Sequence, residues 1–188
     1  GKRKADYTTV SEVVTEELWQ KHLNGELIIG IKPEINNRAK WGCIDVDPSS
    51  YKDFNEKKFI NIIKEYKLPL VPVKSKSGGL HLFLFLNHWA SVEQIREVLD
   101  KWNNKFFMSK EVFPCNKAVG MPYHKAERAV EYAYSDDNQA ILVGGFIEEA
   151  FKKRNSIEYF LKFKTDKYEP EESYSDFPPC IQKLLNDK

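Results

Sequence analysis

Cysteine is scarce in this chain, and its spacing excludes two classes of small protein. The 188 residues contain only Cys43, Cys115 and Cys180. An odd number of widely separated thiols predicts neither a disulfide framework nor a zinc site, because both need paired or closely spaced cysteines. The sequence therefore favours a reducing, cytoplasmic setting, in a bacterium, an archaeon or a phage-infected host cell.

Long apolar runs and a strong net charge are also missing. No segment reaches the roughly 20 apolar residues of a membrane helix, and the opening residues GKRK precede no apolar stretch typical of a signal peptide. We therefore expect no membrane partner. The formal net charge is only +1, so any binding of nucleic acid depends on local patches rather than on a basic field around the whole molecule.

The composition that is present is that of a folded domain. Hydrophobic residues make up 41% of the chain and charged residues 30%, which argues against disorder. Segments with helical periodicity alternate with short apolar runs, and this predicts an α+β fold, a mixed α/β sheet covered by helices. The predicted helices are residues 11–23 (capped by Ser11 or Thr15), 56–66, 91–102 and 146–154; the predicted strands are 26–31, 39–47, 70–74, 80–86, 111–113, 119–121 and 129–134.

The organisation changes after about residue 154. Residues 1–154 are expected to form the main domain, and residues 155–176 a helical tail and a polar, acidic linker. Prolines at the start of an apolar segment then predict a new helix in residues 177–188. We expect this last segment to open a C-terminal helical region of a longer protein.

Residues 41–48, WGCIDVDP, carry the most informative pattern. Asp45 and Asp47 are two positions apart in an apolar run, so in a strand both carboxylates project from the same face. Neighbouring carboxylates repel each other, and a hard divalent cation such as Mg²⁺ or Mn²⁺ relieves that repulsion through oxygen ligands. Taken alone, the pair is more often explained by two solvated acids at the end of a strand.

A basic, glycine-containing turn follows after one predicted helix. Residues 74–81, KSKSGGLH, contain two lysines and two glycines and end at His81, which opens an apolar strand. Glycines let backbone N–H groups approach a phosphate, and the lysines add positive charge. A plain hairpin turn with a satisfied histidine is the alternative. Because the acids and the turn lie on successive strands of a predicted β-α-β unit, together they indicate a metal-bound polyphosphate site.

These motifs resemble the archaeo-eukaryotic primase superfamily, the primase-polymerases of archaea, eukaryotes, phages and mobile elements. The resemblance rests on residues 43–47 (CIDVD), on 79–81 (GLH) and on the KSG lead-in at 76–78, and it extends over most of residues 7–150. It implies a catalytic domain with an RRM-like β-α-β sheet and an N-terminal α/β unit. It also implies a third acid, which we assign to Glu111, with Glu131, Asp136 and Asp137 as competitors.

The third motif departs from the family pattern in two places. Cys115 stands where a lysine is expected, and Met121 precedes Pro122. Lys117 is the nearest cation. The resemblance implies that two Mg²⁺ or Mn²⁺ ions bind to the catalytic residues Asp45, Asp47 and Glu111. It further implies that NTP or dNTP binds to Lys76, Ser77, Gly78, Gly79, His81 and Lys117.

The function expected on this basis is that of a DNA primase or polymerase. Its partners would be a single-stranded DNA template, a primer, and a C-terminal helical or helicase region of the full-length protein. A metal-dependent nuclease or a nucleotide-sugar transferase also uses paired acids, and a non-catalytic nucleic-acid-binding module could share the same sheet. The lysine-serine-glycine turn favours a triphosphate substrate, and a binding module has no need of Asp45 and Asp47.

Overall fold

A mixed sheet forms the centre of the molecule. The computed structural model describes residues 13–106, 108 and 111–165. Within them the sheet has the strand order β2-β3-β5-β4, with β6 added beside β3, and all its neighbouring strands are antiparallel. The expected α+β class is therefore confirmed. The strands are β2 (Glu34–Ile35), β3 (Arg38–Val46), β4 (Val71–Lys74), β5 (Leu80–Ser91) and β6 (Glu111–Phe113).

Two helices connect these strands. Helix α2 (Glu56–Glu65) joins β3 to β4, and α3 (Val92–Phe106) joins β5 to β6, which gives the order β-α-β-β-α-β. Strands β3 and β4 run parallel but have β5 between them, so the predicted β-α-β unit is split by the hairpin β4–β5. This hairpin brings the residues after α2 next to the acid-bearing strand.

Local signals fix where these helices begin. Asn55 caps α2, since its side chain accepts a hydrogen bond from the Lys57 N–H. Ser91 and Gln94 form a reciprocal capping box on α3: the Gln94 N–H donates to Ser91 Oγ at 3.2 Å, and the Ser91 N–H donates to Gln94 Oε1 at 3.3 Å. Both helices start within one residue of the predicted position.

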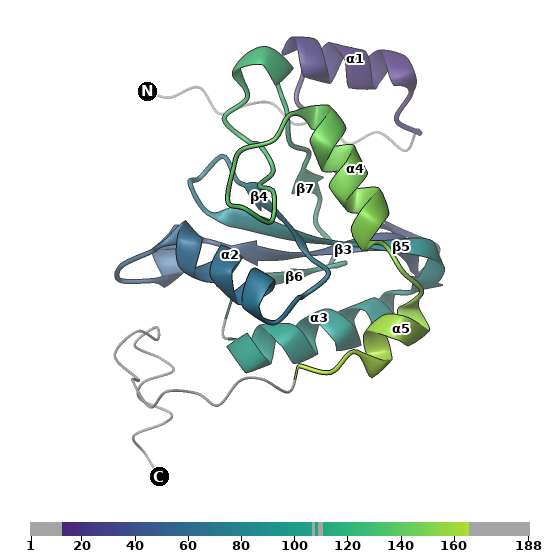
Figure 1. Cartoon of the computed structure of the whole chain (residues 1–188). Coiled ribbons are helices and arrows are strands. Elements are labelled where there is room, and N and C mark those ends of the chain that lie inside the picture. Colours follow the sequence, from purple (N-terminus) through teal and green to yellow (C-terminus); the bar gives the residue numbers. More distant parts are fainter. Residues whose placement is uncertain (1–12, 107, 109–110, 166–188) are drawn as a thin grey trace.

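The two faces of the sheet carry different cores. Alternate residues of β3 such as Ile44 and Val46 belong to a large core beneath the sheet, which α2, α3 and α5 (Ile157–Lys162) complete. The other alternating set of residues in β3, which includes Cys43, faces a smaller core that contains Phe83 and Phe113. Figure 1 shows α3 and α5 on one side of the sheet and α1 and α4 on the other. Asp45 lies on the face of the smaller core.

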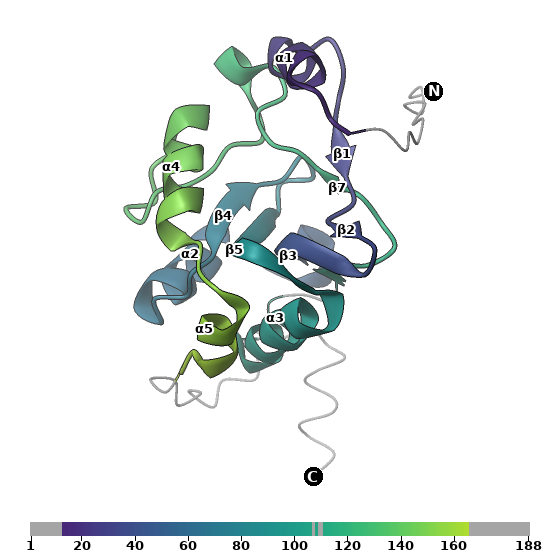
Figure 2. The same ribbon diagram turned by 90° about the vertical axis from the view of Figure 1, so that its right-hand side faces the viewer.

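A second, two-stranded sheet lies near the smaller core. Strand β1 (Gly30–Ile31) pairs with β7 (Val119–Gly120), next to α1 (Glu16–Asn24), as Figure 2 shows. The fully buried His22 connects α1 to the segments beside β1 and β7. The Ile29 N–H donates to its Nδ1 at 3.2 Å, and its Nε2 lies 2.8 Å from the Pro122 carbonyl oxygen. An accepting Nδ1 leaves the proton on Nε2, which donates to Pro122. Helix α4 (Val143–Lys153) covers the same face.

Several predicted boundaries are wrong, mostly in the second unit. Helix α1 begins at Glu16, later than predicted, although Thr15 is confirmed as one of its two predicted caps. The strand predicted at 26–31 reduces to two residues, and 129–134 makes only isolated bridges. The predicted tail also contributes to the main core, because Phe160 packs against Trp102 at 6.2 Å between ring centroids. Ser11 and the segment 177–188 lie outside the described residues.

None of the helices in the described part of the chain is both long enough and apolar enough to cross a bilayer.

Candidate active site

Three polar side chains form a row across the sheet, close to the end of β3 and to the beginnings of β5 and β6. Asp45 on β3 is directly opposite His81 on β5 and directly opposite Glu111 on β6. Directly opposed residues in antiparallel strands place their side chains on the same face, with Cβ atoms about 4.5–5.5 Å apart. The register therefore brings together one residue from each of the three sequence motifs.

Asp45 lies at the centre of this row, where the ionised form of its carboxyl group is electrostatically unfavourable. Burial above all, and then the negative charges of Glu111 and Asp47, together raise the pKa of its carboxyl group to about 6, against the opposing effect of Lys117. Like charges directly opposite each other in a sheet are destabilising. A site that keeps two acids in this position is suited to a bound cation.

His81 contacts Asp45 as a neutral ring. Its Nε2 lies 3.5 Å from Asp45 Oδ1, and its side chain is only 15% exposed. Burial lowers the pKa of His81, and the charge of Glu131 opposes this only in part. At neutral pH the contact is therefore between an imidazole and a carboxylate, and His81 still has an N–H to donate.

Lys117 balances the third acid of the row. Its ammonium group donates a hydrogen bond to Glu111 Oε1, which raises the pKa of Lys117. Lys117 thus lies beside the carboxylates, and no triphosphate pocket is needed to explain its position. The Lys117 side chain is 68% exposed, so a cation at this point can exchange one anionic partner for another.

Asp47 lies just beyond the strand. Strand β3 ends at Val46, and Asp47 caps the short 3₁₀ helix η1 (Pro48–Ser50) by accepting a hydrogen bond from the Ser49 N–H at 2.8 Å. The strand predicted to reach residue 47 is therefore one residue too long. Only one oxygen of Asp47 takes part in this cap, so the second remains available to a ligand.

The turn before His81 is closed by its own hydrogen bonds. The Gly78 N–H donates to the Ser75 carbonyl oxygen at 3.0 Å, and the Gly79 N–H donates to Ser75 Oγ at 3.0 Å. These glycine N–H groups are thus used within the turn, contrary to the expectation that they approach a phosphate. The groups that the turn presents to solvent include the exposed side chains of Lys76 and Ser77. Buried Ser75, which organises the turn, had no predicted role.

Gly79 has a different, steric role. A Cβ at this position would lie 2.1 Å from the Val46 carbonyl oxygen and 2.7 Å from Pro48 Cδ. Only glycine lets the turn approach the end of β3 this closely. Gly78 needs its glycine for another reason, a backbone φ of +88°.

The remaining charged candidates are distributed elsewhere. Lys74 is opposite Leu80, on the face away from Asp45, and its Nζ lies 3.6 Å from Glu56 Oε2. Asp136 is paired with Lys153 at 2.8 Å, and Asp137 lies 3.6 Å from Lys64. Among the three competitors for the third acid, Glu131 carries a charge that acts on a residue of the row, His81.

The donor set suits a hard cation, although it is not a closed metal site. Within the described ranges, no three or more His, Cys, Asp or Glu side chains are grouped so that they could hold a metal ion. Asp45 and Glu111 are nevertheless opposed in register, and their repulsion raises the pKa of Asp45. Carboxylate oxygens are the ligands that Mg²⁺ and Mn²⁺ prefer.

Comparison with known proteins identifies the family. A family described as the archaeo-eukaryotic primase domain of the TOTE conflict system matches residues 3–116, which is more than half of the chain. The match includes the whole row of Asp45, His81 and Glu111 and ends one residue before Lys117. No curated protein matches the chain. The resemblance seen in the sequence is therefore confirmed, and the chain belongs to the archaeo-eukaryotic primase domain family of TOTE conflict systems.

Proposed function

We propose that this chain is a template-dependent nucleotidyltransferase, a DNA primase or polymerase that adds nucleotides from NTP or dNTP to a 3′-hydroxyl. Its membership of an archaeo-eukaryotic primase family supports this class of reaction. The observation that carries the proposal is the in-register row of His81, Asp45 and Glu111. Two crowded acids beside a neutral histidine suit a metal-bound triphosphate better than they suit a structural sheet.

Asp45 and Glu111, with the free oxygen of Asp47, are the residues that would hold Mg²⁺ or Mn²⁺. When bound there, such a metal would favour the alkoxide form of the attacking hydroxyl and would neutralise charge on the departing pyrophosphate. Asp45 has a pKa of about 6, so it is mostly ionised at neutral pH and able to act as a ligand.

The other residues of the row and turn would bind the triphosphate. His81 is neutral and partly exposed, so it can donate an N–H to a phosphate oxygen. Lys76 and Ser77 supply an ammonium and a hydroxyl group from the exposed part of the turn. Gly79 allows this turn to lie against the end of β3, close to the acids. Lys117 would exchange Glu111 for a phosphate oxygen.

An extension assay tests the proposal. Primed and unprimed single-stranded DNA are incubated with labelled dNTP or NTP and with Mg²⁺ or Mn²⁺, and both longer and shorter products are measured. We expect extension by the wild type and none by the double variant Asp45→Ala/Asp47→Ala. Asp136→Ala/Asp137→Ala is the matched control, because these acids pair with lysines away from the row. Shortened DNA without extension would instead support a nuclease.

A further inference from the structure

A pocket lies beside the turn that carries the proposed triphosphate ligands. It has a volume of about 530 Å³, and its walls are the segment before α2, the first residues of α2 and Gly78. This volume is within the range of roughly 300–1,000 Å³ found for small-ligand sites. The lining residues are Asp53, Phe54, Asn55, Glu56, Lys57 and Gly78. None of them belongs to the row of Asp45, His81 and Glu111.

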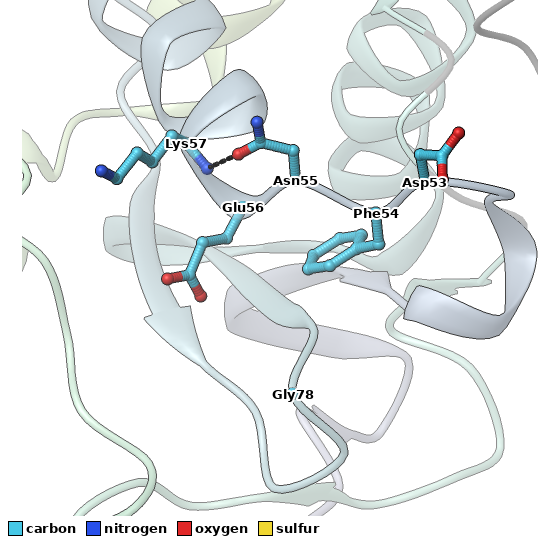
Figure 3. Close-up of a pocket in the computed structure, with 6 residues that line it drawn as sticks. All are labelled: Asp53, Phe54, Asn55, Glu56, Lys57 and Gly78. Carbon is cyan, nitrogen blue, oxygen red and sulfur yellow. Dashed lines mark hydrogen bonds between the residues drawn. The ribbon is translucent and has the colours of Figure 1, made fainter.

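Phe54 gives this pocket a flat, fixed aromatic surface. Its ring is stacked on Phe59 with an interplanar angle of 22° and a centroid distance of 5.7 Å, and it also contacts Tyr51 at 6.1 Å. Figure 3 shows the Phe54 ring on the side of the chain that faces Gly78. Because Phe59 covers one face of the ring, the other side can stack on a planar ligand.

Glu56 supplies a hydrogen-bond acceptor next to this ring. Its carboxylate extends to the same side as Phe54, whereas Asp53 and Lys57 extend away (Figure 3). Lys74 Nζ lies 3.6 Å from Glu56 Oε2, so this carboxylate has one cationic neighbour. Asn55 is held by its cap to the Lys57 N–H. A carboxylate in this position repels phosphate and accepts hydrogen bonds from amino groups.

Gly78 keeps the pocket open towards the turn. Its φ of +88° is unfavourable for other residues, and no atom lies within 4 Å of the position that a Cβ would take. A ligand in the pocket therefore meets backbone at this point and lies next to Ser77. The pocket and the proposed triphosphate groups thus share one turn.

We propose that this pocket binds a nucleobase, stacked on Phe54 and hydrogen-bonded through an amino group to Glu56. The choice of ligand rests on the proposed function. The base belongs either to the incoming nucleotide or to an unpaired position of the bound strand. The two sources share the same chemistry, a flat ring with an exocyclic amine.

Cytosine and thymine make a matched pair of probes, because they differ at position 4 in an amino group against a carbonyl. Affinities of the chain for dCTP, dTTP, oligodeoxycytidylate and oligothymidylate are measured without metal. We expect Phe54→Leu to weaken binding of both bases by roughly 5–50-fold, in line with the loss of one aromatic stack. Phe54→Tyr should restore it. Glu56→Gln keeps an acceptor oxygen but removes its charge, so it should weaken cytosine relative to thymine about fivefold, the difference between a charged and a neutral hydrogen bond.

Two controls separate the pocket from general effects. Phe151→Leu removes a ring from the exposed face of α4, and Glu65→Gln removes a charge from the other end of α2. Loss of affinity for the triphosphates alone assigns the pocket to the incoming nucleotide, and loss for the oligonucleotides alone assigns it to the strand. Wild-type affinity of both Phe54→Leu and Glu56→Gln for all four probes overturns the proposal. These titrations measure binding and no extension, so their outcome does not depend on the result of the polymerase assay.

Discussion

Replacing Asp45 by Asn should stabilise the metal-free protein. The substitution keeps the size of the side chain and removes a charge that burial, Glu111 and Asp47 all disfavour. A pKa of about 6 against the ordinary 3.8 corresponds to at most about 3 kcal/mol at neutral pH. Since the side chain is 26% exposed, solvent screening reduces the expected gain to about 1–2 kcal/mol. For a chain of this size that gain raises Tm by about 2–8 °C.

The gain should depend on pH in a defined window. A carboxyl group whose pKa is raised by folding contributes its full stability below pH 3.8, where it is protonated in both states, and loses it as the pH rises through about 6. The difference in free energy of unfolding between Asp45→Asn and the wild type should therefore grow between these values and stay constant above them. Urea unfolding in a metal chelator, at several pH values, measures this difference.

Two comparisons decide whether the reasoning holds. Asp53→Asn removes an exposed carboxylate of the same type and should change stability by less than about 0.5 kcal/mol at every pH. Adding Mg²⁺ or Mn²⁺ should raise the Tm of the wild type more than that of Asp45→Asn. The wild type keeps the Asp45 carboxylate, and a cation bound to it relieves the repulsion between the acids. If Asp45→Asn is no more stable than the wild type at pH 7.5 without metal, the crowding of Asp45 has been misjudged.

Three further substitutions test the rest of the site. His81→Ala should weaken triphosphate binding about 10–100-fold in a direct titration, as expected for one hydrogen bond to a charged group, and should leave DNA affinity unchanged. Unchanged triphosphate affinity with weakened DNA affinity would place His81 in another subsite. Glu111→Gln should slow primer extension about 10²–10³-fold at saturating nucleotide, with partial recovery at higher Mn²⁺, whereas Asp136→Asn should extend normally. Gly79→Ala should lower the free energy of unfolding by about 1–3 kcal/mol, because its Cβ would overlap a strand carbonyl. Gly120→Ala, where a Cβ meets nothing within 4 Å, should change it little, and equal effects would rule out the steric role of Gly79.

The parts of the fold that sequence periodicity predicts are those with strong local signals. Helices α2 and α3 start within a residue of the prediction because Asn55 and Ser91 cap them. The acid strand was predicted almost in full, since apolar residues continue to Val46 and Pro48 then ends it. In these segments local preference and tertiary packing agree.

The second unit was predicted poorly because tertiary contacts determine it. Residues 26–31 read as a strand, yet only Gly30 and Ile31 pair, and their partner β7 is about 90 positions away in the sequence. His22 has no local signal, although it binds both Ile29 and Pro122. Phe54 likewise became a pocket wall only through its stack on Phe59 and the approach of Gly78.

The row of site residues was predictable in its members but not in its energetics. Spacing alone places Asp45 and Asp47 on one face, but the end of β3 at Val46 makes Asp47 a helix cap and leaves Asp45 as the crowded acid. It is Glu111, directly opposite on β6, that creates most of the like-charge effect on Asp45. Ile44 and Val46, the immediate neighbours of Asp45, are fully buried on the other face of the same strand. Burial of such side chains contributes about 1.5–3 kcal/mol each, which is enough to hold a strand whose other face carries opposed carboxylates at this end. At this end of β3 the large core thus stabilises the strand from one face, and the other face can carry the opposed acids Asp45 and Glu111.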